Sequence, residues 1–147
     1  MPENSVKKIV PIISFETGGL SRDELEAIFE SMPVDITFAD RNDIVTYYNH
    51  PNKRIFPRAQ SDIGRKAQQC FLQAEGDFLE RIEKVNKIVS DLKAGKTPAI
   101  ELCVNRNGHL IHIRYLPVRD NAKSYAGCIE VVQDITDIKK IDAEKKA

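Results

Sequence analysis

The fold of this chain is decided by the stretch IELCVNRNGHLIHIRY, residues 100–115. Its centre, Asn107-Gly108, separates two β-branched runs, and this dipeptide is the strongest short-range signal for a two-residue β-hairpin. Counting outward from the turn places three apolar pairs on one face: Val104 with Ile111, Leu102 with Ile113, and Ile100 with Tyr115. The other face carries two mixed pairs: Cys103 with His112, and Glu101 with Arg114. We therefore predict a ribbon that buries one face, and we interpret Glu101 with Arg114 as an exposed ion pair.

Three further strands are predicted from alternating apolar and polar residues. Downstream of the ribbon, a loop at Asp120 to Ser124 leads to a strand at Tyr125 to Gln133, whose register the loop length leaves open. Upstream, residues 34–39 alternate with period two, and a polar turn at 40–43 leads to a strand at 44–49. The sequence thus predicts a five-stranded antiparallel sheet.

Two helices are predicted from start signals and apolar spacing. The first begins at Ser21, whose capping-box partner is Glu24, and a following proline ends it near Ser31. The longer helix begins at Asp77 and closes before Gly95. Its apolar side chains lie at helical spacing: Phe78, Ile82, Val85, Val89 and Leu92. After the strand at 44–49, residues 50–69 are interrupted by Pro51, Pro57 and Gly64, which predicts short turns and one-turn helices.

These elements define an α+β fold in which a helical layer covers one face of the sheet, because the apolar face must be buried and only the helices are available to cover it. Residues 1–20 form an N-terminal arm, in which Ile9 to Phe15 is a strand or extended segment ended by Gly18-Gly19. The globular domain spans residues 21–135. Residues 136–147 form a charged helical tail that begins at Asp134-Ile135-Thr136.

Composition excludes several classes of function. The chain has 147 residues, 41% apolar and 30% charged, which is typical of one soluble globular domain. Twenty-two basic and twenty-two acidic residues cancel, which argues against nucleic acid as a partner. No apolar run reaches the roughly 18 residues of a membrane span. Three cysteines without a CxxC argue against a disulfide framework or zinc site and favour a reducing cytoplasm.

The order of elements, and several short motifs, resemble a PAS sensor domain. The resemblance covers about Leu25 to Ile141. The motifs that carry it are Asp43-Ile44-Val45 with Tyr48-Asn49, Ile63-Gly64-Arg65, Pro117-Val118-Arg119-Asp120, and Asp134-Ile135-Thr136. In the family, the last motif lies at the end of the sheet, where a signalling helix begins. The resemblance implies that Asp134, Ile135 and Thr136 form a signal hinge.

A narrower resemblance concerns the C-terminal PAS domain of bacterial and archaeal proteins that also carry a hemerythrin-like domain. It rests on four stretches: Leu20 to Asp43, Ile55-Phe56-Pro57-Arg58, Ile63 to Cys70, and Ile111 to Tyr115. Those relatives continue after the cysteine with a His-Pro-Pro stretch, whereas this chain continues with Phe71-Leu72-Gln73. The resemblance implies that this chain is the sensor end of a longer protein.

Cofactor chemistry is the alternative reading. Light-sensing flavin PAS domains place a reactive cysteine directly after a Gly-Arg pair, whereas Cys70 lies six residues after Gly64, so we interpret Cys70 as a small buried hydrophobe. Haem ligation by a histidine is disfavoured because no histidine lies on the predicted long helix. Cys103 opposite His112 lacks a third orienting group for thiol catalysis, and no metal site is predicted.

We therefore predict a non-enzymatic sensory and interaction module. We expect its concave sheet face and the long helix to enclose a small apolar pocket for a hydrophobic ligand. The candidate lining residues are Phe38, Tyr48, Cys70, Val85, Ile111, Ile113 and Tyr115. If side chains fill that pocket, the domain is chiefly a homodimerisation unit, with the first helix and Ile9 to Phe15 covering the sheet edge or a partner subunit. A flavin- or haem-binding redox protein on the same fold is the alternative.

Overall fold

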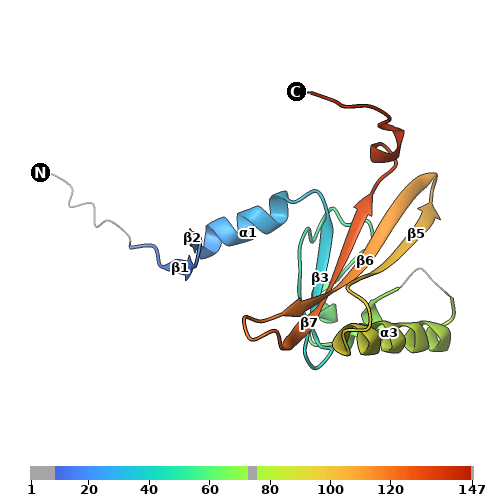
Figure 1. The fold of residues 1–147 in the computed structure, drawn as a ribbon, viewed down its shortest axis with the longest axis horizontal. Coiled ribbons are helices and arrows are strands. Elements are labelled where there is room, and N and C mark those ends of the chain that lie inside the picture. The colour runs from blue at the N-terminus through green and yellow to red at the C-terminus, as the bar shows by residue number, and fades with distance from the viewer. Residues whose placement is uncertain (1–8, 73–75, 147) are drawn as a thin grey trace, which may run out of the picture. The chain divides into compact units, whose positions relative to one another are not determined.

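The computed structural model describes residues 9–72 and 76–146 (Figure 1). By its internal contacts the chain divides into two compact units, Met1–Met32 and Pro33–Ala147, which are described separately. None of the helices in the described ranges combines the length and the apolar composition needed to cross a bilayer.

The N-terminal unit contains a hairpin followed by a helix. Strands β1 (Ile12–Phe15) and β2 (Gly18–Ser21) pair antiparallel, and helix α1 follows at Arg22–Ser31. The capping box is confirmed, since Ser21 Oγ accepts from the Glu24 N–H at 3.1 Å and Glu24 Oε1 accepts from the Ser21 N–H at 2.8 Å. The expectation that Gly18-Gly19 ends the extended arm is wrong. The chain turns at Glu16 and Thr17, and Gly18, whose φ of +139° is a conformation open to glycine, begins β2 opposite Phe15.

The second unit is built on the predicted five-stranded antiparallel sheet. Its strands lie in the order β4-β3-β7-β6-β5. Their bounds are β3 Asp35–Asp40, β4 Val45–Tyr48, β5 Ile100–Arg106, β6 His109–Arg119 and β7 Tyr125–Asp134. The last strand in sequence therefore lies at the centre of the sheet, between the N-terminal strand β3 and the ribbon of β5 and β6. Its register, which the sequence left open, pairs Thr37 with Glu130 and Tyr115 with Glu130.

The predicted ribbon is confirmed pair by pair. Val104 lies opposite Ile111, Leu102 opposite Ile113 and Ile100 opposite Tyr115. The two turn residues, Asn107 and Gly108, have φ of 52° and 81°, which is the backbone of a type I′ turn. On the inner face Ile111, Ile113 and Tyr115 are buried, whereas Glu101, Cys103 and Asn105 on the other face of β5 are exposed.

The helical layer is confirmed with one correction. Two short pieces, η1 (Gln60–Asp62) and α2 (Ala67–Cys70), precede the long helix α3 (Phe78–Lys93). Asp77 caps α3 by accepting from the Glu80 N–H at 2.9 Å. The buried residues of α3 are Val85, Ile88, Val89 and Leu92. Phe78 was expected in this apolar stripe but is 52% exposed; it is the first residue of the helix, and the buried residues begin two turns later at Val85.

One hydrophobic core joins this layer to the inner face of the sheet, with Val85, Val89 and Leu92 of α3 in the same buried cluster as Ile113 and Tyr115. Figure 1 shows α3 lying across one end of the sheet. The apolar side of the ribbon therefore faces the long helix, as predicted.

The predicted helical tail over 136–147 is wrong in its extent. Within the described part of the tail, which ends at residue 146, helical structure is limited to the 3₁₀ turn η2 (Ile138–Lys140). Ile138 and Ile141 are half exposed, at 50% and 57%. A segment this short without a packed apolar face gains too little to offset helix nucleation.

Candidate functional site

Within the described ranges, buried side chains occupy the space between the sheet and the helices. Five of the seven predicted pocket residues lie in the buried core cluster, and each is 4% exposed or less: Cys70, Val85, Ile111, Ile113 and Tyr115. Tyr48 lies opposite Thr37 near the sheet edge and is half-buried. Phe38 does not share this face, because the register pairs it with Tyr47 and Ile129 while its neighbours Thr37 and Ala39 point inward.

A buried ion pair lies at the centre of this interior. Arg58 Nη2 and Glu130 Oε1 are 2.9 Å apart, and their side chains are only 1% and 3% exposed. The Tyr115 hydroxyl donates to Glu130 Oε2 at 2.5 Å, so both carboxylate oxygens have donors. Arg58 also donates from Nη1 to the Cys70 carbonyl at 2.5 Å and from Nε to Thr37 Oγ1 at 3.2 Å. These bonds join the loop after β4, helix α2 and the three central strands.

A second set of polar contacts anchors that loop to β3. The Asp35 carboxylate accepts from the Ile55 N–H at 2.6 Å, and Arg54 Nη2 donates to Thr37 Oγ1 at 2.9 Å. Asn49 Oδ1 accepts from the Ile36 N–H at 2.6 Å. Burial lowers the pKa of Arg54, and the charge of Asp35 opposes that shift. These contacts place Arg58 over the sheet.

Sequence reasoning missed Arg58 and Glu130. The one available signal is Glu130, a carboxylate flanked by Ile129 and Val131 in the middle of β7. A charge at an inward position needs a buried partner. The alternation of residues along β7 does not show which of its faces is inward. Glu130 therefore could not be assigned a buried partner from the sequence.

One tyrosine and two cysteines of the interior are held in their neutral forms. Burial raises the pKa of Tyr115 far above its usual value, and the negative charge of Glu130 adds to the shift. Burial, and then the nearby Asp62 carboxylate, raises the pKa of the Cys70 thiol. Burial raises the pKa of Cys128 to about 12. At neutral pH these groups are a phenol and two thiols, and thiols in this state are poor nucleophiles.

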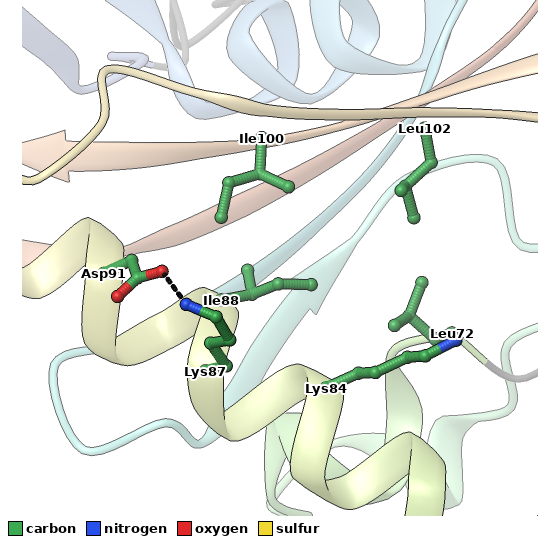
Figure 2. A pocket seen from close by; sticks show the side chains of 7 residues that line it. All are labelled: Leu72, Lys84, Lys87, Ile88, Asp91, Ile100 and Leu102. Carbon is green, nitrogen blue, oxygen red and sulfur yellow. Dashed lines mark hydrogen bonds and ion pairs between the residues drawn. The ribbon is translucent and has the colours of Figure 1, made fainter.

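An open pocket of about 270 Å³ lies beside this interior, between α3 and β5 (Figure 2). In Figure 2, Ile100 and Leu102 project from β5 toward Ile88 and Leu72 on the opposite side. Its full lining is Leu72, Lys84, Lys87, Ile88, Asp91, Ile100 and Leu102. The wall is apolar, and Lys87 Nζ pairs with Asp91 Oδ2 at 2.8 Å at one end. None of the seven predicted pocket residues is among this lining: five of them lie deeper in the core, and Phe38 and Tyr48 lie on β3 and β4.

The end of β7 is tied to the tip of the β5–β6 ribbon. Asp134 Oδ1 accepts from the Thr136 N–H at 3.0 Å and from its hydroxyl at 2.6 Å, while Asp134 Oδ2 lies 2.7 Å from His109 Nδ1. Leu110 N–H donates to Thr136 Oγ1 at 2.9 Å, and Ile135 N–H donates to the Leu110 carbonyl at 2.9 Å. The hydrogen bonds from Thr136, with a smaller effect of His109, lower the pKa of Asp134. We call this arrangement the latch.

The mixed face of the ribbon differs from expectation in one pair. Glu101 Oε2 lies 3.2 Å from His112 Nε2, so its side-chain partner is His112 and not the predicted Arg114. The carboxylate reaches the diagonal neighbour, which lies on the same face. In the described ranges, no cluster of three or more His, Cys, Asp or Glu side chains has metal-binding geometry.

Comparison with protein families gives a match over residues 25–136 to the family model described as PAS domain. The chain belongs to the PAS domain family. PAS domains are generally sensory, non-enzymatic modules. No curated protein matches the sequence.

Solved structures share the PAS fold. A C-terminal domain from Streptococcus mutans is 28% identical, with a TM-score of 0.79, and the match covers 90% of this chain and 98% of that one. The VqmA–ligand–DNA complex from Vibrio cholera is 21% identical over 80% of this chain and 53% of that one, with a TM-score of 0.54. A sensory box sensor histidine kinase from Vibrio cholerae is 9% identical over 76% and 89%, with a TM-score of 0.51. The last two likenesses concern the fold alone.

Proposed function

We propose that this PAS domain is a non-enzymatic sensory module that binds a small hydrophobic molecule and forms a homodimer. The observation that carries the proposal is the pocket between α3 and β5, which is open and apolar while the interior behind it is filled. A complex with a ligand is recorded for the structurally similar VqmA protein, which supports small-molecule binding as a use of this fold.

The pocket limits the class of ligand. Its volume of about 270 Å³ is slightly below the roughly 300–1,000 Å³ typical of ligand sites, so the ligand is small. Leu72, Ile88, Ile100 and Leu102 provide an apolar wall, which favours a hydrophobic body. A ligand that reached deeper would contact the candidate residues Cys70, Val85, Ile111, Ile113 and Tyr115, which lie in the core cluster.

The ribbon provides a route from this pocket to the chain end. Ile100 and Leu102 line the pocket and belong to β5, which pairs along its whole length with β6. The tip of that ribbon holds the latch through His109 and Leu110. A ligand that moves β5 relative to α3 would therefore displace the ribbon tip and loosen the hinge at Asp134, Ile135 and Thr136. Output would pass through the tail that follows the hinge.

The wider context is also part of the proposal. We infer that the chain is the C-terminal sensor part of a longer cytoplasmic signalling or regulatory protein, in which a hemerythrin-like domain precedes it. The globular domain of this protein is proposed to span residues 21–135, with an arm before it and a linker after it. The alternative is a flavin- or haem-binding redox protein on the same fold.

Two variants with the same substitution test the ligand site. Leu102→Trp fills the pocket, whereas Leu79→Trp adds the same side chain to α3 at a position that is 71% exposed and outside the lining. A panel of small apolar compounds is screened by thermal unfolding of the wild-type chain. A hit at a hundredfold excess over its Kd stabilises the fold by about 2.7 kcal/mol.

We expect Leu102→Trp to abolish the thermal shift and Leu79→Trp to keep it. A shift that persists in Leu102→Trp would show that the compound binds elsewhere, and the absence of any hit would refute ligand binding by this pocket. An absorption spectrum of the freshly purified protein tests the alternative, since visible bands would support a flavin or haem.

A further inference from the structure

The two edges of the five-stranded sheet are treated differently by the chain. The edge strand β4 is covered by the segment before α2. Val45 N–H donates to the Arg65 carbonyl at 2.9 Å, Gly64 N–H donates to the Val45 carbonyl at 2.8 Å, and Ile44 forms a bridge with Lys66. The backbone of β4 therefore offers little to another strand.

The opposite edge, β5, has no such cover. The type I′ turn makes Arg106 and His109 a hydrogen-bonded pair, so residues 100, 102, 104 and 106 bond to β6. The N–H and C=O groups of Glu101, Cys103 and Asn105 then point away from the sheet. Over the described ranges no hydrogen bond to these three backbones is found. β5 also has seven residues and no proline, whereas β4 has four residues.

An unpaired edge of this length is a template for another strand. Natural sheets normally prevent such pairing with a proline, a lysine, a bulge or a covering segment at the edge. β5 contains no proline or lysine, and its pairing to β6 has no register shift. Figure 1 shows β5 at the margin of the sheet. The structure thus retains one edge that can accept a strand.

We propose that a second copy of this chain pairs with that edge, β5 against β5 in antiparallel orientation, about a two-fold axis at Cys103. This inference rests on the proposed homodimer and names its interface. The axis places Cys103 opposite Cys103 of the second copy and Glu101 opposite Asn105 of the second copy. All three outward residues then form hydrogen-bonded pairs, which gives about six backbone hydrogen bonds.

Self-pairing in this register satisfies the side chains as well as the backbone. Glu101 meets a neutral amide and not a second carboxylate, so the symmetric arrangement contains no like-charge pair. Leu102 lies opposite Val104 of the second copy on the inner side, which extends the apolar face across the axis. A shift of two residues in either direction leaves only about four backbone hydrogen bonds, because an outward residue then faces the turn or the chain before the strand.

A charge pair at one position tests this register. Asn105→Lys places a cation opposite Glu101 of the second copy, and symmetry creates the contact twice. Asn105→Glu places two carboxylates in the same contacts. The side chain of Asn105 is exposed, and its backbone N–H and C=O make no bond within the chain's own sheet as the structure describes it. We therefore expect both variants to keep the fold. Analytical ultracentrifugation should show a dimer Kd about two- to thirty-fold lower for Asn105→Lys and higher by a similar factor for Asn105→Glu.

Cys103 offers an independent readout, because it is the only exposed cysteine of the three. Opposite residues in a hydrogen-bonded pair have Cα atoms about 5.5 Å apart, within the range that a disulfide spans. Copper-phenanthroline oxidation should therefore convert the wild-type dimer into a covalent dimer that a reducing agent separates. Cys103→Ser should remain monomeric on a denaturing gel while it still dimerises in solution.

The outcomes separate the interface from the proposed function. A wild-type chain that stays monomeric at every concentration overturns both the homodimer and this interface. If the protein dimerises, but neither Asn105 variant changes the dimer Kd and no Cys103 cross-link forms, the homodimer stands and the β5 pairing is overturned. Opposite shifts of the two variants together with the cross-link establish the interface.

Discussion

Replacement of Glu130 by glutamine should strongly destabilise the fold. Glu130→Gln keeps the size of the side chain but removes the anion that faces Arg58 at 2.9 Å. The guanidinium is then left in a site where its side chain is 1% exposed, without a counter-charge. Removing one partner of a buried ion pair typically costs about 3–5 kcal/mol.

That cost is a large part of the free energy of unfolding of a typical domain, which is roughly 5–15 kcal/mol. For a unit of this size it corresponds to a Tm lower by about 12–20 °C. Tyr115→Phe provides a graded comparison, since it deletes one donor to the carboxylate and keeps the ion pair. We expect a loss of about 1.5–3 kcal/mol for Tyr115→Phe.

The double variant Arg58→Met with Glu130→Leu separates charge from packing. It removes both charges and fills the space with apolar atoms, so it should be more stable than Glu130→Gln although it changes more atoms. Urea unfolding followed by circular dichroism gives the free energies of unfolding. A cost below about 1 kcal/mol for Glu130→Gln, or a double variant that is the least stable of the set, would show that the ion pair does not have this role.

Three further predictions concern single positions. Ile113→Asp should unfold the domain, because Ile113 is 4% exposed and its carboxylate would have no partner; a soluble variant with the wild-type melting curve would contradict the assigned face. At pH 8 a thiol reagent should label Cys103 quickly and leave buried Cys70 and Cys128 unlabelled, since burial raises both of their pKa values; rapid labelling of two or three thiols would contradict it. The pKa of Asp134 lies below its ordinary value of 3.8, so the stabilisation from the latch is complete above 3.8 and is lost only as the pH falls through the lowered value. An NMR titration of the Asp134 carboxyl carbon should have its midpoint below 3.8, and a midpoint above it would disprove the latch.

The sequence was informative wherever the signal is local. Asn107-Gly108 fixes the register of β5 and β6 because a two-residue turn leaves one way to count outward. Ser21 with Glu24, and Asp77 with Glu80, mark helix starts through hydrogen bonds that span three residues. The family was also recognisable from short motifs at these turns and strand ends.

The sequence was less informative wherever a residue's role depends on a distant partner. Phe38 belongs to an alternating strand, and only the pairing of β3 with β7 shows that its neighbours Thr37 and Ala39 face the core. Arg58 and Glu130 are 72 residues apart, and each looks like an ordinary surface charge until the sheet brings them together.

The amino-acid sequence alone therefore determined the five strands of the sheet, the two longer helices, the ribbon register and the family, because turns, caps and periodicity act over a few residues. Only the tertiary structure decided which face of β7 is inward, how the interior is filled, where a pocket stays open, and which sheet edge is bare. These features depend on contacts between segments far apart in the chain. The helix and strand propensities of neighbouring residues do not predict such contacts.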